Sequence, residues 1–168
     1  MARALIVGCG CRGRLLGERL LDSGWAVRGT SRRAAGLKAI EAAGIEAAQA
    51  DPEQPGTLLE LVGDVTVVVW LLGSARGEAG LLEAIHGSRL ERMLEKLVDT
   101  PVRGFVYEGT GEVPASLLGR GAATVRGASE TWRVPTAIVE AEPTDPALWT
   151  EAVQAAVLNL VSPAGDSI

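Results

Sequence analysis

The sequence is poor in the side chains that most often carry metal, redox or proton-transfer chemistry. Its 168 residues include two cysteines, one histidine, one tyrosine and two lysines. Two cysteines and a single histidine are too few to complete a structural zinc site. The apolar runs all fall short of the ~18 residues of a membrane span. We therefore expect no metal site, no structural disulfide and no membrane partner.

Two further absences narrow the class of protein. The N-terminus leads directly into a strand-like segment and lacks the apolar region and cleavage site of a signal peptide. With 21 acidic against 16 basic groups, the net charge is −5, whereas sequence-independent nucleic-acid binding needs a surplus of cations. Hydrophobic residues make up 47% and charged residues 22%, which is typical of a globular protein. These features predict a cytoplasmic protein with one domain over residues 1–168 and no nucleic-acid partner.

Short apolar runs alternate with helical patterns along the whole chain. The predicted strands cover residues 4–7, 25–30, 45–50, 64–72, 102–107 and 136–139. The predicted helices cover residues 14–23, 33–43, 57–62, 80–98, 122–132 and 149–160. Strands that alternate with helices pair in parallel through right-handed crossovers. The fold class is therefore α/β: a doubly wound, mostly parallel six-stranded sheet with expected strand order 3-2-1-4-5-6.

A glycine loop follows the first predicted strand and opens the first helix. Residues 8–13 read Gly-Cys-Gly-Cys-Arg-Gly, which is the spacing G-x-G-x-x-G. In this context the first glycine allows a tight turn, the second lets a pyrophosphate approach the backbone, and the third lets helix and strand pack. The alternative is a tight turn without a ligand. We expect an NAD(P)-binding Rossmann fold in which the cofactor contacts Gly8, Gly10, Cys11, Arg12 and Gly13.

The end of the second predicted strand indicates which dinucleotide is bound. An NAD site usually places an acid there to bind the ribose hydroxyls. This chain instead has Thr30, Ser31, Arg32 and Arg33, whose hydroxyl and guanidinium groups suit a 2′-phosphate. We expect these four residues to bind NADP in preference to NAD, with Arg12 reaching the same phosphate. The alternative is that both arginines only solvate a helix start, where positive charge is slightly unfavourable.

The cysteines, the histidine and two tryptophans have simpler interpretations. Cys9 and Cys11 are expected to fill the crowded glycine loop, although a redox role stays open because both lie near a helix N-terminus. His86 falls on an apolar helical stripe and is expected to be packed or half-exposed. Trp70 and Trp149 are expected in the core.

The sequence resembles a known group, the extended and atypical short-chain dehydrogenases/reductases, and among them the NAD-dependent epimerase/dehydratase branch. The resemblance covers about residues 1–140 and is carried by the glycine loop, the segment 28–33, Asp51, the strand end at 65–73 and the segment 105–110. It implies that Asp51 approaches the adenine amino group and that the central ribose is lined by Leu72, Gly73 and Ser74. It also places Thr110 where these enzymes keep a catalytic Ser or Thr.

The chain departs from this family in its chemistry. The family relies on a Tyr and a Lys four residues apart, but Tyr107 is the only tyrosine here and no lysine follows it at that spacing. We therefore carry two hypotheses: an NADP-dependent oxidoreductase or epimerase-like enzyme with a rearranged site, and a non-catalytic NADP-sensing module. In the first, Thr110 and Ser74 lie nearest the nicotinamide and Glu108 or Glu112 supplies the acid for a small-molecule substrate. A ligand-free fold that forms homo-oligomers is a third possibility.

Overall fold

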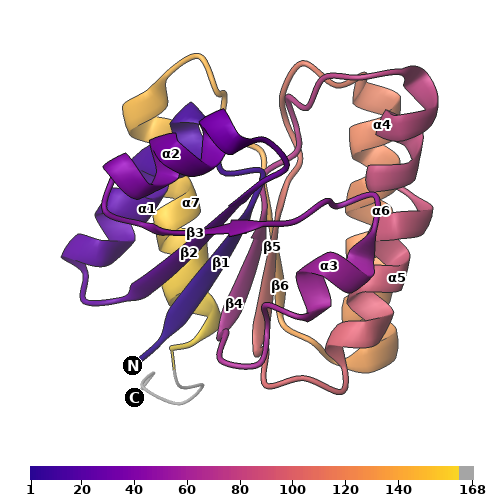
Figure 1. Cartoon of the computed structure of the whole chain (residues 1–168). Helices are drawn as coiled ribbons and strands as arrows, with labels where there is room; N and C mark the ends of the chain where they lie inside the picture. Colours follow the sequence, from indigo (N-terminus) through magenta and orange to yellow (C-terminus); the bar gives the residue numbers. More distant parts are fainter. Residues whose placement is uncertain (163–168) are drawn as a thin grey trace.

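The protein is a three-layer α/β structure, seen in a computed structural model that describes residues 1–162 (Figure 1). Residues 163–168 of the predicted domain lie outside the described residues. The sheet has six strands in the order β3-β2-β1-β4-β5-β6, and every neighbouring pair is parallel. The strands are β1 (Arg3–Val7), β2 (Ala26–Ser31), β3 (Glu46–Gln49), β4 (Val67–Trp70), β5 (Gly104–Glu108) and β6 (Thr136–Val139). The predicted fold class and strand order are therefore confirmed.

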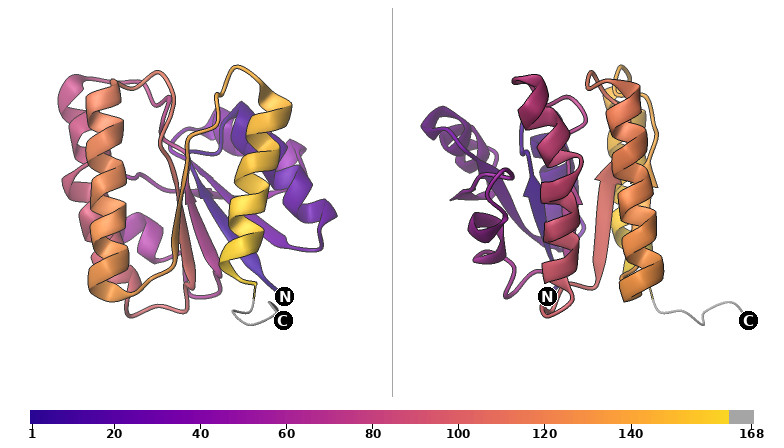
Figure 2. Two further views of the ribbon diagram at one scale, coloured as in Figure 1. Left: turned by 180° about the vertical axis from the view of Figure 1, so that it is seen from behind. Right: turned by 90° about the vertical axis from the view of Figure 1, so that its right-hand side faces the viewer.

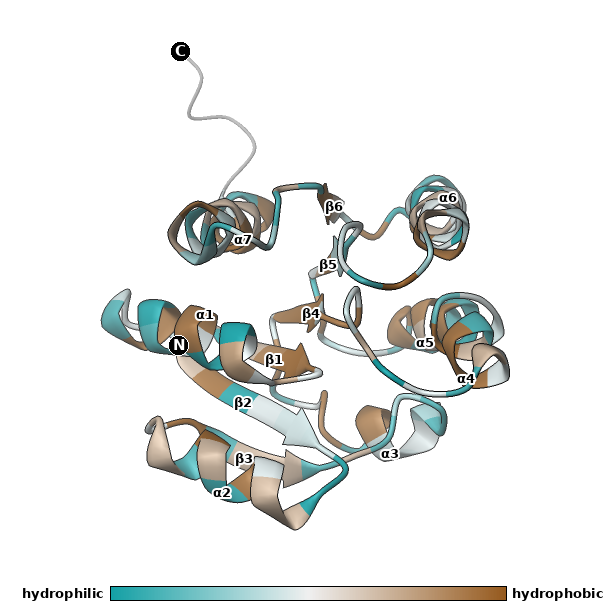
Figure 3. Cartoon of the chain, turned by 90° about the horizontal axis from the view of Figure 1, so that it is seen from above, coloured by the Kyte–Doolittle hydropathy of each residue, from teal (hydrophilic) through white to brown (hydrophobic). Residues whose placement is uncertain are grey.

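Helices cover both faces of the sheet (Figure 2). On one face lie α1 (Cys11–Asp22), α2 (Ala34–Ala42) and α7 (Pro146–Leu160) (Figure 3). On the other lie α3 (Pro55–Leu59), α4 (Ala79–Ile85), α5 (Ser88–Leu97) and α6 (Ala115–Trp132). No helix within residues 1–162 combines the length and the apolar character needed to cross a membrane.

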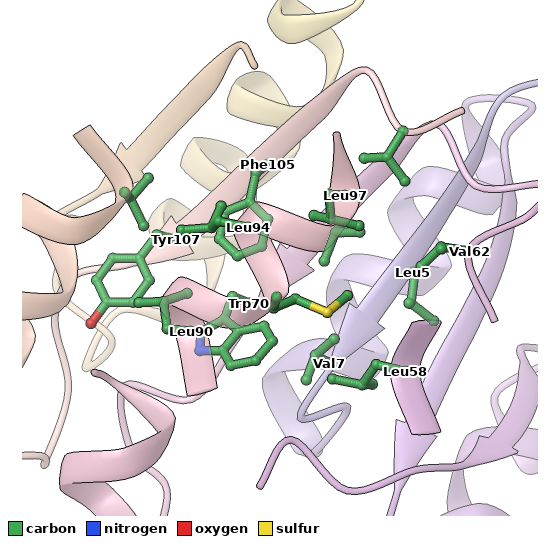
Figure 4. Packing of buried hydrophobic residues seen from close by; sticks show 14 of the residues in the cluster. Leu5, Val7, Leu58, Val62, Trp70, Leu90, Leu94, Leu97, Phe105 and Tyr107 are labelled. Carbon is green, nitrogen blue, oxygen red and sulfur yellow. The ribbon is translucent and has the colours of Figure 1, made fainter. Parts of the chain in front are cut away.

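The two faces have separate hydrophobic cores because the central strands are apolar on both sides. All four residues of β4 are fully buried, as expected for a central parallel strand. One core gathers Trp70, Phe105 and Tyr107 beneath α4, α5 and α6 (Figure 4). The other places Trp149 against the opposite face, among residues of α1, α2 and the strands. Trp70 and Trp149 are both fully buried, so their predicted core positions are confirmed.

Two helix predictions differ most from the structure in their bounds. The helix expected over residues 80–98 is divided into α4 and α5, because Gly87 has a non-helical backbone and the preceding His86 turns into the core. The helix expected from residue 122 begins at Ala115, after Pro114. The glycines in the first half of this helix weaken the helical pattern in the sequence. Leu118, Gly121 and Ala122 are nevertheless buried on one face of it.

Candidate functional site

A pocket of about 400 Å³ opens at the carboxyl ends of the central strands. The chain leaves β1 towards one face of the sheet and enters β4 from the other face, so the strand order reverses between these two strands. Ligands of doubly wound folds bind at the point where the strand order reverses. Most of the predicted cofactor-binding residues line this pocket: Gly8, Gly10, Cys11, Arg12, Gly13, Thr30, Ser31, Arg32, Arg33, Leu72 and Ser74.

The three glycines of the loop have different physical reasons for lacking a side chain. Gly8 has φ +79°, and a Cβ there would lie 2.7 Å from Cδ2 of Leu72. A Cβ on Gly13 would lie 3.3 Å from Cγ2 of Ile6, so this glycine lets α1 pack closely on β1. A Cβ on Gly10 would meet no described atom within 4 Å. Gly10 lines the pocket, and the space next to its Cα is open.

The first turn of α1 presents backbone donors at this open space. Gly10 is the N-cap of α1 and provides no side chain to cap it. The first bond back to the cap runs from the Arg14 amide to the Gly10 carbonyl at 2.9 Å, so the amides of residues 11–13 precede the helical hydrogen-bond pattern. With the positive end of the helix dipole, these amides favour an anion.

The charge of the pocket is strongly unbalanced. Five of its lining residues are arginines, whereas its only acidic lining residue within the described chain is Glu108. The lining arginines are Arg12, Arg14, Arg32, Arg33 and Arg76. The hydroxyl of Ser31 accepts a hydrogen bond from the Arg33 amide at 3.2 Å, which fixes the turn that carries Arg32 and Arg33. A pocket of this charge suits a ligand with several negative groups.

Arg12 does not extend towards Arg32 and Arg33. Its guanidinium donates to Oε2 of Glu108 at 3.1 Å and lies 4.9 Å from the ring centre of Trp149. In this structure the side chain is therefore engaged with β5 and α7, across the pocket from the end of β2. The predicted contact of Arg12 with a 2′-phosphate stays a prediction.

Glu108 is a buried carboxylate at the end of β5, with its side chain 1% exposed. Besides the bond from Arg12, its Oε1 accepts a hydrogen bond from the Gly73 amide at 2.8 Å. Burial raises the pKa of Glu108, while Arg12, the Gly73 amide and the Trp149 indole act in the opposite direction. The indole nitrogen makes no hydrogen bond of good geometry within residues 1–162, although Trp149 lines the pocket. The pocket wall therefore holds an incompletely satisfied polar group.

Three residues of the predicted site do not line this pocket. Asp51 lies in a smaller pocket that adjoins it through Arg32, and its carboxylate accepts from the Glu53 amide at 2.9 Å. The backbone amide of Gly73 donates a hydrogen bond to the Glu108 carboxylate. Thr110, the predicted catalytic residue, donates its hydroxyl to the Ala141 carbonyl at 2.9 Å and so links the segments after β5 and β6.

Tyr107 and His86 form a buried pair outside the pocket. The Tyr107 hydroxyl lies 2.7 Å from Nδ1 of His86, and Nε2 of His86 lies 2.9 Å from the Leu72 carbonyl. Because a carbonyl only accepts, Nε2 carries the hydrogen and Nδ1 accepts from the tyrosine. Burial raises the pKa of Tyr107 and lowers that of His86. His86 is fully packed, and the only tyrosine of the chain is part of the core.

The two cysteines differ in environment. Cys9 is buried beneath the glycine loop against Gly29, and burial raises the pKa of its thiol to about 12. Cys11 is exposed in the first turn of α1. The prediction that both cysteines fill the loop is correct for Cys9 and wrong for Cys11, because position 11 points away from the packed side of the helix.

The sequence reasoning missed the contributions of Trp149, Arg14 and Arg76 to the pocket. Trp149 was expected in the core, and its apolar helical spacing gives no sign of a second role at the pocket wall. The sequence identifies Glu108 only as one of two candidate acids, together with Glu112. Its pairing with Arg12 joins residues 96 positions apart, which a local pattern cannot reveal.

Comparisons with known proteins support the fold. No protein-family model matches the sequence, and no curated protein matches it significantly. Among solved structures, a short-chain dehydrogenase/reductase superfamily protein from Agrobacterium tumefaciens with bound NAD is 21% identical, with a TM-score of 0.64 over 81% of this chain and 48% of that one. The chain shares the doubly wound parallel α/β fold of the matching half of that structure.

Two other structures with this fold extend the comparison. The triphenylmethane reductase of Citrobacter sp. complexed with NADP(H) is 20% identical, with a TM-score of 0.61 over 80% of this chain and 48% of the reductase. The UDP-N-acetylglucosamine 4-epimerase of Bacillus cereus is 14% identical, with a TM-score of 0.63 over 82% of this chain and 53% of the epimerase. The chain spans about half the length of these three structures.

Proposed function

We propose that the chain binds a nicotinamide dinucleotide, NADP in preference to NAD, as the cofactor-binding part of an oxidoreductase or epimerase-like enzyme. The observation that carries this proposal is the pocket itself: an open glycine loop at a helix N-terminus, surrounded by five arginines. The similar structures from Agrobacterium and Citrobacter, with NAD and NADP(H) respectively, support it.

The residues present fit such a cofactor. The amides of residues 11–13 would hold the pyrophosphate, and Arg32 and Arg33 the 2′-phosphate. Asp51 would meet the adenine, while Leu72 and Ser74 would line the central ribose. The bound cofactor supplies hydride transfer, so the protein has to bind, orient and manage protons.

A non-catalytic, NADP-sensing module is the second candidate. It is favoured by the position of Tyr107, which is buried against His86, and by the lack of any lysine among the residues that line the pocket in the described chain. Loss of a positioned proton donor typically lowers a rate by about 10²–10⁴-fold. Consumption of NADPH with a panel of carbonyl substrates would support the enzyme, whereas tight binding without turnover would support the sensor.

Cofactor binding is tested first by calorimetric titration of the full chain with NADP, NADPH, NAD and NADH. Gly10→Val should lower the affinity for every cofactor by at least about tenfold, because the valine side chain would occupy the space open to the pyrophosphate. The fold should persist, since position 10 has no described neighbour within 4 Å of an added Cβ and a negative φ of −85°.

Gly63→Val is the matched control. A Cβ on Gly63 also meets nothing within 4 Å, and this residue is exposed and does not line the pocket. The control should bind cofactor like the original chain. Equal affinities for Gly10→Val and the original chain would exclude the glycine loop as the binding site.

A further inference from the structure

The Arg12–Glu108 ion pair occupies an unusual place, at the wall of the pocket between three elements. Arg12 comes from the first turn of α1, Glu108 from the end of β5, and the Gly73 amide from the segment after β4. The side chain of Glu108 is 1% exposed and that of Arg12 is 25% exposed. The carboxylate is therefore fixed in the interior, whereas the Arg12 side chain remains partly exposed and lines the pocket.

Arg12 belongs to the same helical turn that presents its amides to the pocket. An anion held by the amides of residues 11–13 would lie next to the backbone of Arg12. A phosphate group accepts the planar, multiply donating guanidinium of arginine in a bidentate manner. The Arg12 side chain is long and partly exposed, so it can reach either Glu108 or an anion at the helix start.

We propose that Arg12 exchanges partners when an anion binds at the start of α1, and that Glu108 takes up a proton when Arg12 leaves it. The anion is the pyrophosphate of the dinucleotide, so this exchange rests on the proposed function. Cofactor binding would then deliver a protonated carboxylic acid at the pocket wall. The chain has no tyrosine there, so Glu108 becomes its proton-holding group.

The charges around Glu108 give the direction of this change. Arg12 on α1 is the charged group that lowers the pKa of Glu108, and burial raises it. The other contacts are the Gly73 amide and the Trp149 indole of α7, both neutral, and the adjacent Tyr107 is neutral because its pKa is raised. Arg14 and Arg76 line the pocket without bonding the carboxylate. Removing Arg12 leaves burial as the dominant influence, which favours the protonated form.

Proton uptake on binding is measured by calorimetric titration of the full chain with NADP and NADPH in buffers of different ionisation enthalpy, across a pH series. The original chain should take up as much as about one proton per bound cofactor at pH values between the pKa of Glu108 in the two states. Glu108→Gln keeps the size and the acceptor oxygen of the side chain but cannot titrate. It should bind cofactor without this uptake.

The matched control is Glu140→Gln, which removes an exposed carboxylate beyond the end of β6 at the same edge of the sheet. It should retain the full uptake. Cofactor binding with no proton uptake, or with equal uptake in Glu108→Gln, would overturn the exchange and leave the proposed function standing. Failure of every cofactor to bind the original chain would overturn both.

Difference infrared spectroscopy gives a second, direct measurement. The stretching band of a protonated carboxyl group should appear when NADPH binds to the original chain and should be missing in Glu108→Gln. In Arg12→Gln the same band should be present before any cofactor is added, because the buried carboxyl has already lost its counter-charge. A Glu108 that stays ionised in Arg12→Gln would contradict the proposal even if this variant binds cofactor weakly.

Discussion

At the residue scale, Arg32 and Arg33 distinguish the two possible dinucleotides. Both line the pocket at the end of β2, where a site for NAD usually carries an acid. Arg32→Asp should weaken NADP by about 10–100-fold, because it removes a charge-assisted contact and adds repulsion. The affinity for NAD should change by less than about threefold, since NAD has no phosphate at this position. Calorimetric titration with both cofactors measures the split.

The control for Arg32→Asp makes the same change of charge elsewhere. Arg92 is exposed on α5, away from the pocket lining, and Arg92→Asp should leave both affinities unchanged. A general electrostatic effect would weaken NADP in both variants. Equal losses of NADP and NAD in Arg32→Asp alone would place the 2′-phosphate elsewhere in the pocket and leave Arg32 with a general role in cofactor binding.

At the scale of elements, the seating of α6 on β5 depends on one glycine. A Cβ added to Gly121 would lie 2.6 Å from Cζ of Tyr107, whose ring is fully buried and held by His86. The ring has no room to move away, so Gly121→Ala should displace α6 and lower the free energy of unfolding by about 1–3 kcal/mol. Denaturant titration followed by circular dichroism measures this loss.

Gly119→Ala is the matched substitution on the exposed face of α6. Beyond the backbone of its own helix, no described atom lies within 4 Å of a Cβ at this position. The variant should raise the free energy of unfolding by about 0.5–1 kcal/mol, because alanine loses less backbone entropy than glycine in a helix. If Gly121→Ala also raised the free energy of unfolding, helix propensity and not the contact with Tyr107 would govern this helix.

An element can be predicted from the sequence when the residues that determine it are close together along the chain. The glycine loop lies within six consecutive residues between a strand and a helix, and the alternation of elements implies parallel pairing, so the pocket edge and the strand order are predictable. The break between α4 and α5 is not, because it depends on His86 meeting Tyr107, 21 positions away. The Arg12–Glu108 pair is hidden for the same reason.

At the scale of the whole molecule, two buried titratable groups make the stability of the fold depend on pH in opposite directions. Burial raises the pKa of Glu108 and lowers that of His86. Glu108 therefore contributes stability at low pH that is lost as the pH rises through its folded pKa. His86 contributes stability above the unfolded pKa of about 6.5, which is lost as the pH falls.

Substitution of His86 separates the two contributions. As the pH falls below about 6.5, the unfolded chain binds a proton at His86 that the folded chain excludes, which lowers the free energy of unfolding by as much as about 1.4 kcal/mol per pH unit. His86→Gln should lower stability by about 1–3 kcal/mol at neutral pH, because the bonds to Tyr107 and Leu72 are disturbed.

The deciding measurement is how the stability difference between the two proteins changes with pH, and not the size of that difference at one pH. The original chain and His86→Gln are compared by denaturant titration from about pH 5 to about pH 7.5, the range in which histidine titrates. The difference between their free energies of unfolding should shrink as the pH falls. His86 is the only histidine in the sequence, so no second imidazole contributes to this difference. A difference that stays constant with pH would mean that folded and unfolded chains bind the proton equally. The imidazole would then be accessible to protons in the folded chain, and its bond to the Leu72 carbonyl at the pocket edge would hold in both charge states.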